Sequence, residues 1–216
     1  MQIVDITGPT YHGMWTYGSP YPEVVVEEIP APEWIEFPTY SWRFELGAQT
    51  GTYLETSLHL WREGPPLVDI PVESLFMRDA VVVHVPKAAD ERIEVEDLEA
   101  SGVEVRKGDA VFVDTGWDAH WDQEDFVAAC PWFSHDAMCW ILDREPFLMG
   151  GDMPRFDSWA DPQGFFGRFF RQGTLLLAPV VNLGQVTAPR CKLVALPFKV
   201  TQSCAAPCRA LLIEGG

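Results

Sequence analysis

Short apolar runs bounded by turn residues constrain the fold of this chain more than any other feature of its sequence. Val81–Val85 and Ala110–Asp114 are rich in β-branched residues and end at turn residues, which is typical of buried strands. Helices are indicated over residues 94–101 and over residues 133–144, where Ser134 can cap apolar residues spaced for one helical face. Strands therefore outnumber helices and both kinds mix along the chain, which predicts an α/β or α+β fold. Further strands are expected at residues 2–6, 22–29, 147–149, 174–179, 192–197 and 209–214.

The size and composition of the chain suit one globular domain over residues 1–216. A hydrophobic fraction of 47% and a charged fraction of 22% exclude a largely disordered chain. The formal net charge of -17, without a basic cluster, argues against nucleic acids and anionic membranes as partners, because both need Lys and Arg on one face. No window approaches the roughly 20 apolar residues of a membrane span, so we expect a cytoplasmic protein.

The segment from Gln49 to His59, QTGTYLETSLH, gathers chemically capable side chains. Gln49, Tyr53, Glu55 and His59 have the same parity, so an extended segment would direct all four to one side. In a helix, Gln49 would instead meet Tyr53, and Glu55 would meet His59. Either geometry brings the Glu55 carboxylate toward the His59 imidazole, where it raises the imidazole pKa and fixes which ring nitrogen carries the proton. The pair is a candidate general acid and base, and the alternative is a satisfied hydrogen bond in the core.

Side chains near this pair suggest how a carbonyl substrate could be held. The Tyr53 hydroxyl can donate to a developing oxyanion, and the Gln49 amide suits a substrate carbonyl, although Tyr53 could also be core packing. Trp15 and Tyr17 in an early loop, and Trp61 just after the motif, are candidates for an aromatic substrate wall. Such a pocket favours a flat or apolar small molecule.

Asp152 and three late cysteines each have two possible roles. Asp152 could act as a second acid or orient the substrate, and its alternative is a turn or helix-capping carboxylate. The spacing of Cys204 and Cys208 resembles no common zinc pattern, so together with Cys191 they are expected to be structural thiols. The alternative is a nucleophilic Cys204 or Cys208 beside His59.

The segment 49–59 resembles the signature His-x-Gly-Thr-His-x-Asp-x-Pro-x-His of the cyclase family of hydrolases, which includes kynurenine formamidase and isatin hydrolase. Gly51, Thr52 and His59 match the signature. The resemblance implies a swivelling β/β/α fold, hence the α/β class, and a homodimer or homotetramer. Further matches follow in the family's order along nearly the whole chain, at Ile3–Thr7, Lys107–Trp117, Gly151–Asp157 and Ala206–Ala210.

The resemblance also implies that the family's metal ligands are replaced. In the family, the first two histidines and the aspartate of the signature hold a divalent metal, and the last histidine is catalytic. This chain has Gln49, Tyr53 and Glu55 at the three metal positions. Val181 stands where two-metal members have a glutamate, and Phe169 stands at or near the position of their additional histidine. Since glutamine is a poor ligand for zinc or manganese and neither valine nor phenylalanine binds a cation, we expect no bound metal.

We therefore expect an enzyme that acts on a small carbonyl compound, such as a cyclic, ester or amide-like substrate, through acid-base catalysis by His59 and Glu55, with Tyr53 assisting. A catalytic zinc lowers the pKa of water from about 15.7 to about 7, whereas acid-base catalysis contributes about 10²–10⁴-fold, so a metal-free site favours activated substrates. One alternative is a divergent metal-dependent amide or cyclic-amide hydrolase that holds one zinc or manganese ion weakly at Glu55 and His59. Another is a small-molecule-binding protein that kept the fold without catalysis.

Overall fold

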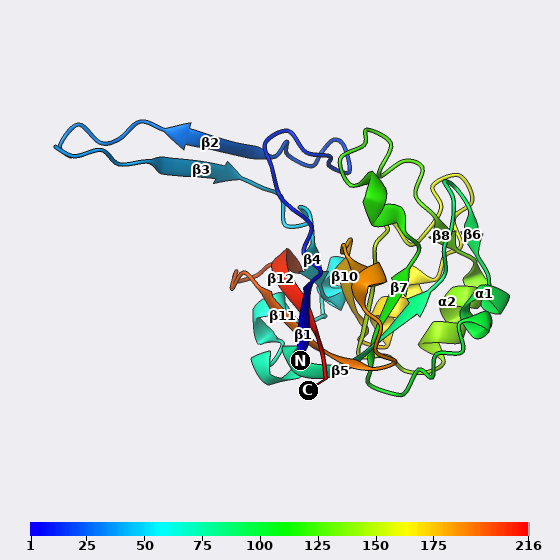
Figure 1. Ribbon diagram of the computed structural model, residues 1–216. Coiled ribbons are helices and arrows are strands. Elements are labelled where there is room, and N and C mark those ends of the chain that lie inside the picture. Colours follow the sequence, from blue (N-terminus) through cyan, green and yellow to red (C-terminus); the bar gives the residue numbers. More distant parts are fainter. Residues whose placement is uncertain (216) are drawn as a thin grey trace.

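Seven strands close into a ring at the centre of the protein (Figure 1), in a computed structural model that describes residues 1–215. Their order is β12-β11-β5-β7-β9-β10-β4, and the pairing of β4 with β12 closes the ring. β1 pairs with the C-terminal half of β12. The bounds of these strands are β1 Gln2–Asp5, β4 Tyr53–Glu55, β5 Phe76–His84, β7 Ala110–Asp114, β9 Leu148–Gly151, β10 Leu175–Ala178, β11 Cys191–Pro197 and β12 Ala205–Glu214.

The ring encloses an apolar core, and a second core lies outside it. β5, β7, β9 and β10 run parallel to one another, and the other pairings in the ring are antiparallel. Because successive side chains of a strand point to opposite faces, each ring strand can fill the interior with every second residue. Leu54, Val82, Phe112 and Leu212 belong to the inner cluster. Residues of the opposite parity, such as Val111, join the outer cluster beneath the helices.

Three short helices cover the outer face of the parallel strands: α1 Val95–Ala100, α2 His135–Leu142 and α3 Phe166–Arg171. α2 begins as the sequence predicted, because the Ser134 hydroxyl accepts the N–H of Ala137 at 3.2 Å. Beside the helices, β6 Arg92–Ile93 and β8 Trp132–Phe133 form a small parallel sheet. Single 3₁₀ turns are η1 Ser57–His59, η2 Leu67–Asp69, η3 Val72–Leu75, η4 Trp117–His120 and η5 Leu183–Gln185.

An antiparallel arm, formed by β2 Val25–Ile29 and β3 Ser41–Glu45, projects from the body (Figure 1). Its two faces differ, because side chains alternate along each strand. One face carries Trp42, which is 55% exposed, and Phe44, which is 66% exposed. The other face carries the ion pair between Glu27 and Arg43 at 3.0 Å. Further exposed aromatic side chains follow in the loop at the tip of the arm, at Trp34, Phe37 and Tyr40.

The mixed α/β class with more strands than helices is confirmed. The sequence did not predict β3, β4, β6, β8 or α3. β4 has three residues and is buried throughout, so it has no alternation to detect. α3 has only six residues, including a glycine, so its phenylalanines at helical spacing, Phe166, Phe169 and Phe170, make a pattern too short to predict a helix. None of the helices in the described part of the chain has the length and apolar character needed to cross a membrane.

Candidate active site

The pairing of β4 with β12 brings together the two chain segments of the site. The register sets Glu55 opposite Ala205, and the N–H of Thr56 donates to the carbonyl of Cys204 at 2.9 Å. β4 then ends, and Thr56 caps the 3₁₀ turn η1, in which the N–H of His59 donates to the Thr56 carbonyl at 3.1 Å. The segment is therefore neither a continuous strand nor a helix. This turn folds the imidazole of His59 back onto the Glu55 carboxylate.

The Glu55 carboxylate is the centre of a polar network. Its Oε1 accepts a hydrogen bond from Nε2 of Gln49 at 2.8 Å and lies 3.1 Å from Nδ1 of His59. The Cys204 thiol lies 3.8 Å from the same oxygen. Hydrogen bonds to Cys204 and to Glu55 raise the pKa of His59 to about 10, against the desolvation that lowers it. The imidazole therefore carries two protons at neutral pH, with Nδ1–H directed at Glu55.

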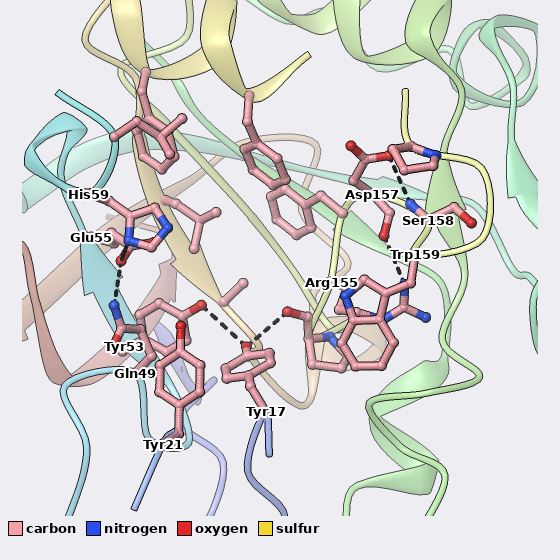
Figure 2. Close-up of a pocket in the computed structure, with 18 residues that line it drawn as sticks. Tyr17, Tyr21, Gln49, Tyr53, Glu55, His59, Arg155, Asp157, Ser158 and Trp159 are labelled. Carbon is pink, nitrogen blue, oxygen red and sulfur yellow. Dashed lines mark hydrogen bonds and ion pairs between the residues drawn. The ribbon is translucent and has the colours of Figure 1, made fainter. Parts of the chain in front are cut away.

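This network lies at one end of a cavity of about 420 Å³, a size that accommodates a small molecule. Nδ1 of His59 faces Glu55, and the other ring nitrogen points into the cavity (Figure 2). Apolar and aromatic side chains make most of the wall. The lining residues are Tyr17, Tyr21, Gln49, Tyr53, Glu55, His59, Leu60, Pro154, Arg155, Phe156, Asp157, Ser158, Trp159, Pro162, Phe166, Phe170, Leu176 and Ala178.

Two tyrosines form a hydrogen-bonded chain along this wall (Figure 2). The Tyr17 hydroxyl donates to the Pro154 carbonyl at 2.9 Å and lies 3.2 Å from the Tyr53 hydroxyl. Since a phenol has one proton, Tyr53 donates in the second of these bonds. Burial raises the pKa of both hydroxyls, so both stay protonated. The Tyr53 proton is thus directed at Tyr17 rather than at the open part of the cavity.

Known proteins resemble this chain in sequence and in fold. The Cyclase family model matches residues 4–158, which is more than half of the chain. The chain belongs to the cyclase family. It is similar to a kynurenine formamidase of Bacillus cereus, with 24% identity over 172 residues, which are 79% of this chain and 78% of that one. With such relatives, it is a cyclase-family enzyme.

Solved structures of the cyclase family share the fold. Isatin hydrolase A from Ralstonia solanacearum superposes with a TM-score of 0.81 and 22% identity, covering 99% of this chain and 92% of that one. A predicted metal-dependent hydrolase from Bacillus stearothermophilus gives a TM-score of 0.79 and 23% identity, covering 99% and 98%. The architecture of this chain is therefore that of the cyclase family over its whole length.

Gln49 and Tyr53, at two of the family's three metal positions, do not fit a divalent metal. Tyr53 keeps its proton and donates it in a hydrogen bond to Tyr17. The Gln49 side chain donates an amide N–H to Glu55, and an N–H cannot bind a metal ion. Phe169 is fully buried, and Val181 is 8% exposed and packs in the same apolar cluster. A different donor set lies close by: ligand atoms of Glu55, His59 and Cys204 are all within 4.8 Å of one another.

Three of the residues expected to bind substrate lie outside this cavity. The Asp152 carboxylate is fully buried and accepts the Thr115 hydroxyl at 2.8 Å and the Trp117 N–H at 2.7 Å, so it takes the capping role. Burial raises its pKa to about 7, against these hydrogen bonds. Trp15 and Trp61 each bury an indole N–H without an acceptor among residues 1–215. Tyr17 and Gln49 do line the cavity.

The far wall of the cavity was not predicted from the sequence. Arg155 is 9% exposed, donates to the carbonyls of Val127 and Ala128 at 2.6 Å each, and lies 4.3 Å from the centroid of the Trp159 ring. Trp159 is 61% exposed at the mouth. This wall lies within and just after the segment Gly151–Asp157 that resembles the family, so its position in the sequence was an available signal. The phenylalanines of α3 gave no such signal, because buried phenylalanine is common in cores.

Proposed function

We propose that this cyclase-family enzyme hydrolyses a small, activated carbonyl compound with an uncharged acyl group, such as a cyclic amide or ester, by acid-base catalysis at His59 and Glu55. The observation that carries the proposal is the Glu55–His59 contact at 3.1 Å at the end of an aromatic cavity. The family membership and the hydrolytic relatives support hydrolysis as the reaction class.

His59 acts as the general acid. Its Nδ1 is held by Glu55, which leaves Nε2 as the nitrogen that faces a bound substrate (Figure 2). In the reaction, water adds to the carbonyl carbon and the bond to the leaving nitrogen or oxygen breaks. His59 gives its Nε2 proton to that leaving atom, and Glu55, whose carboxylate also lines the cavity, takes the proton that water loses. Exchange with solvent restores both groups.

Gln49 and the two hydrogen-bonded tyrosines, Tyr17 and Tyr53, fix the positions of Glu55 and of the cavity wall beside it. Gln49 donates to Glu55 Oε1 at 2.8 Å, so the carboxylate keeps its orientation when His59 gives up its proton. Tyr17 anchors Tyr53 through the bond to Pro154, which fixes the wall next to the carboxylate. We assign Gln49 and Tyr53 as positioning residues and His59 and Glu55 as catalytic residues.

Several features of the cavity support an uncharged acyl group as its ligand. The guanidinium of Arg155 is committed to backbone carbonyls, including that of Asp157 at 2.9 Å. Phe166, Phe170 and Leu176 add apolar wall. Flat rings pack well against such walls, whereas the two cationic groups that line the cavity within residues 1–215, His59 and Arg155, are already paired with Glu55 and with backbone carbonyls.

The test is turnover of a panel of activated esters and cyclic amides by chelator-treated protein. His59→Ala should lower kcat/KM by about 10²–10⁴-fold, the usual contribution of a general acid. The matched control is His12→Ala, which removes an exposed histidine outside the cavity and should leave turnover unchanged. Tight binding of panel compounds without turnover by the wild type would favour the non-catalytic binding protein and reject the proposal.

A second candidate is metal-dependent hydrolysis at a rebuilt site, which the proximity of Glu55, His59 and Cys204 favours. Thiolate, imidazole and carboxylate are ligands that zinc accepts, and zinc would supply an activated water. The probe is Co²⁺, whose thiolate ligation gives charge-transfer absorption. This band should be present in the wild type and in Cys208→Ser and absent in Cys204→Ser. Loss of all turnover on chelation, restored by zinc, would replace the metal-free mechanism with this one.

We also propose that the protein is a homodimer or homotetramer. The support is the arm, whose exposed Trp42 and Phe44 form one face of a two-stranded ribbon. Isolated two-stranded ribbons are at best marginally stable in water, and contiguous exposed apolar surface is typical of interaction sites. A second copy of the chain is always available to cover this face.

A further inference from the structure

A second cavity adjoins the candidate active site. It has a volume of about 490 Å³ and shares two wall residues, Tyr17 and Trp159, with the first cavity. Both of these side chains stand along the wall of the first cavity in Figure 2. Trp15, expected from sequence to form a substrate wall, lines the second cavity instead. The remaining lining residues are Tyr11, Gly13, Thr16, Gly18, Asp122, Gln123, Glu124, Val127 and Ala128.

The walls of the second cavity are aromatic and its charges are negative. Trp15 packs against Tyr17 with ring centroids 6.0 Å apart and against Phe126 with ring centroids 5.0 Å apart. Asp122 and Glu124 are the charged lining residues, and neither forms an ion pair within residues 1–215. No lysine or arginine of the described chain lines this cavity.

This combination selects for positive charge. Aromatic rings attract cations electrostatically, and although the Trp159 ring already packs against the Arg155 guanidinium at 4.3 Å, Trp15 and the tyrosines remain, and the carboxylates of Asp122 and Glu124 add to that attraction. An anion would be repelled, and a neutral ligand would gain only apolar contact. The net charge of -17 also raises the concentration of cations around the whole molecule.

We propose that the second cavity is a binding subsite for an organic ammonium group. Because Tyr17 and Trp159 border both cavities, a ligand that extends across them places its ammonium group beside Asp122 and Glu124 and its acyl group beside His59. The substrate class is then an amine-bearing carbonyl compound. This step rests on the proposed function of the first cavity, whereas binding of the ammonium group itself does not.

The test compares choline with its uncharged isostere 3,3-dimethylbutan-1-ol by calorimetry on the chelator-treated full chain. Choline should bind at least about tenfold more tightly than the isostere, and the double change Asp122→Asn with Glu124→Gln should remove most of that difference. Asp125→Asn is the matched control, since this exposed carboxylate belongs to the same segment but does not line the cavity, and it should bind choline as the wild type does.

Two results would overturn the subsite: equal affinity for choline and its isostere, or an equal loss of choline affinity in the double variant and in Asp125→Asn. His59→Ala separates this inference from the proposed function. That variant should lose turnover and keep choline binding. Turnover that survives in His59→Ala would refute the catalytic proposal alone, and absent choline binding in an active wild type would refute the subsite alone.

Discussion

Replacing Glu55 with glutamine should lower the pKa of His59 from its value of about 10. Oε1 of Glu55 lies 3.1 Å from Nδ1, and the His59 side chain is 36% exposed, so solvent screens the pair. At that separation two unit charges interact by about 1.3 kcal/mol in bulk water and by about 2.7 kcal/mol at an effective dielectric constant of about 40. Since about 1.36 kcal/mol corresponds to one pKa unit, the loss should be about one to two units.

The assay is an NMR pH titration of the imidazole ¹⁵N signals in chelator-treated protein. Glutamine keeps the size of the side chain and a hydrogen-bonding oxygen, so the change isolates the charge. The other histidines of the same sample serve as internal controls and should titrate as in the wild type. An unchanged His59 pKa in Glu55→Gln would refute the pairing of carboxylate and imidazolium on which the acid-base mechanism depends.

Three further outcomes test the fold and its surface. The pKa of Asp152 is raised from 3.8 to about 7 by folding, so its contribution to stability is complete below about pH 4 and is lost as pH rises through 7. The free energy of unfolding, measured with urea, should therefore fall by up to about 4 kcal/mol over that range. Asp152→Asn should remove this pH dependence. Phe169→Ala should cost about 3–5 kcal/mol in the same assay, because the ring is fully buried. Trp42→Glu with Phe44→Glu should convert the assembly to monomer in sedimentation velocity, and a monomeric wild type would contradict the proposed role of the arm.

The sequence predicted those parts of the fold whose signal is local. β7 lies at residues 110–114 as its β-branched run indicated, and α2 begins after Ser134 because a side-chain cap needs only neighbouring residues. The short strand β4 could not be found this way. It is held by pairing with β10 and β12, whose residues lie more than a hundred positions away in the chain.

In the site, too, only the contacts between residues close in sequence were predictable. Glu55 and His59 are four residues apart, and their contact was expected in either local geometry. Cys204 enters the network through the register of β4 against β12, which local sequence does not reveal, so its expected role was that of a structural thiol, with a nucleophile beside His59 as the alternative. The proton of Tyr53 was expected to serve the substrate, and only the contact with Tyr17, from a distant loop, reveals its different direction.

The most direct test of the central claim is the activity of metal-free protein. Elemental analysis of the purified and chelator-treated chain should show metal far below one equivalent. In the kinetic assay, kcat/KM on its best substrate should be unchanged by chelation and abolished by His59→Ala. Zinc or manganese bound at one equivalent, with activity that falls with metal removal and returns with metal addition, would contradict acid-base catalysis by His59 and Glu55 alone.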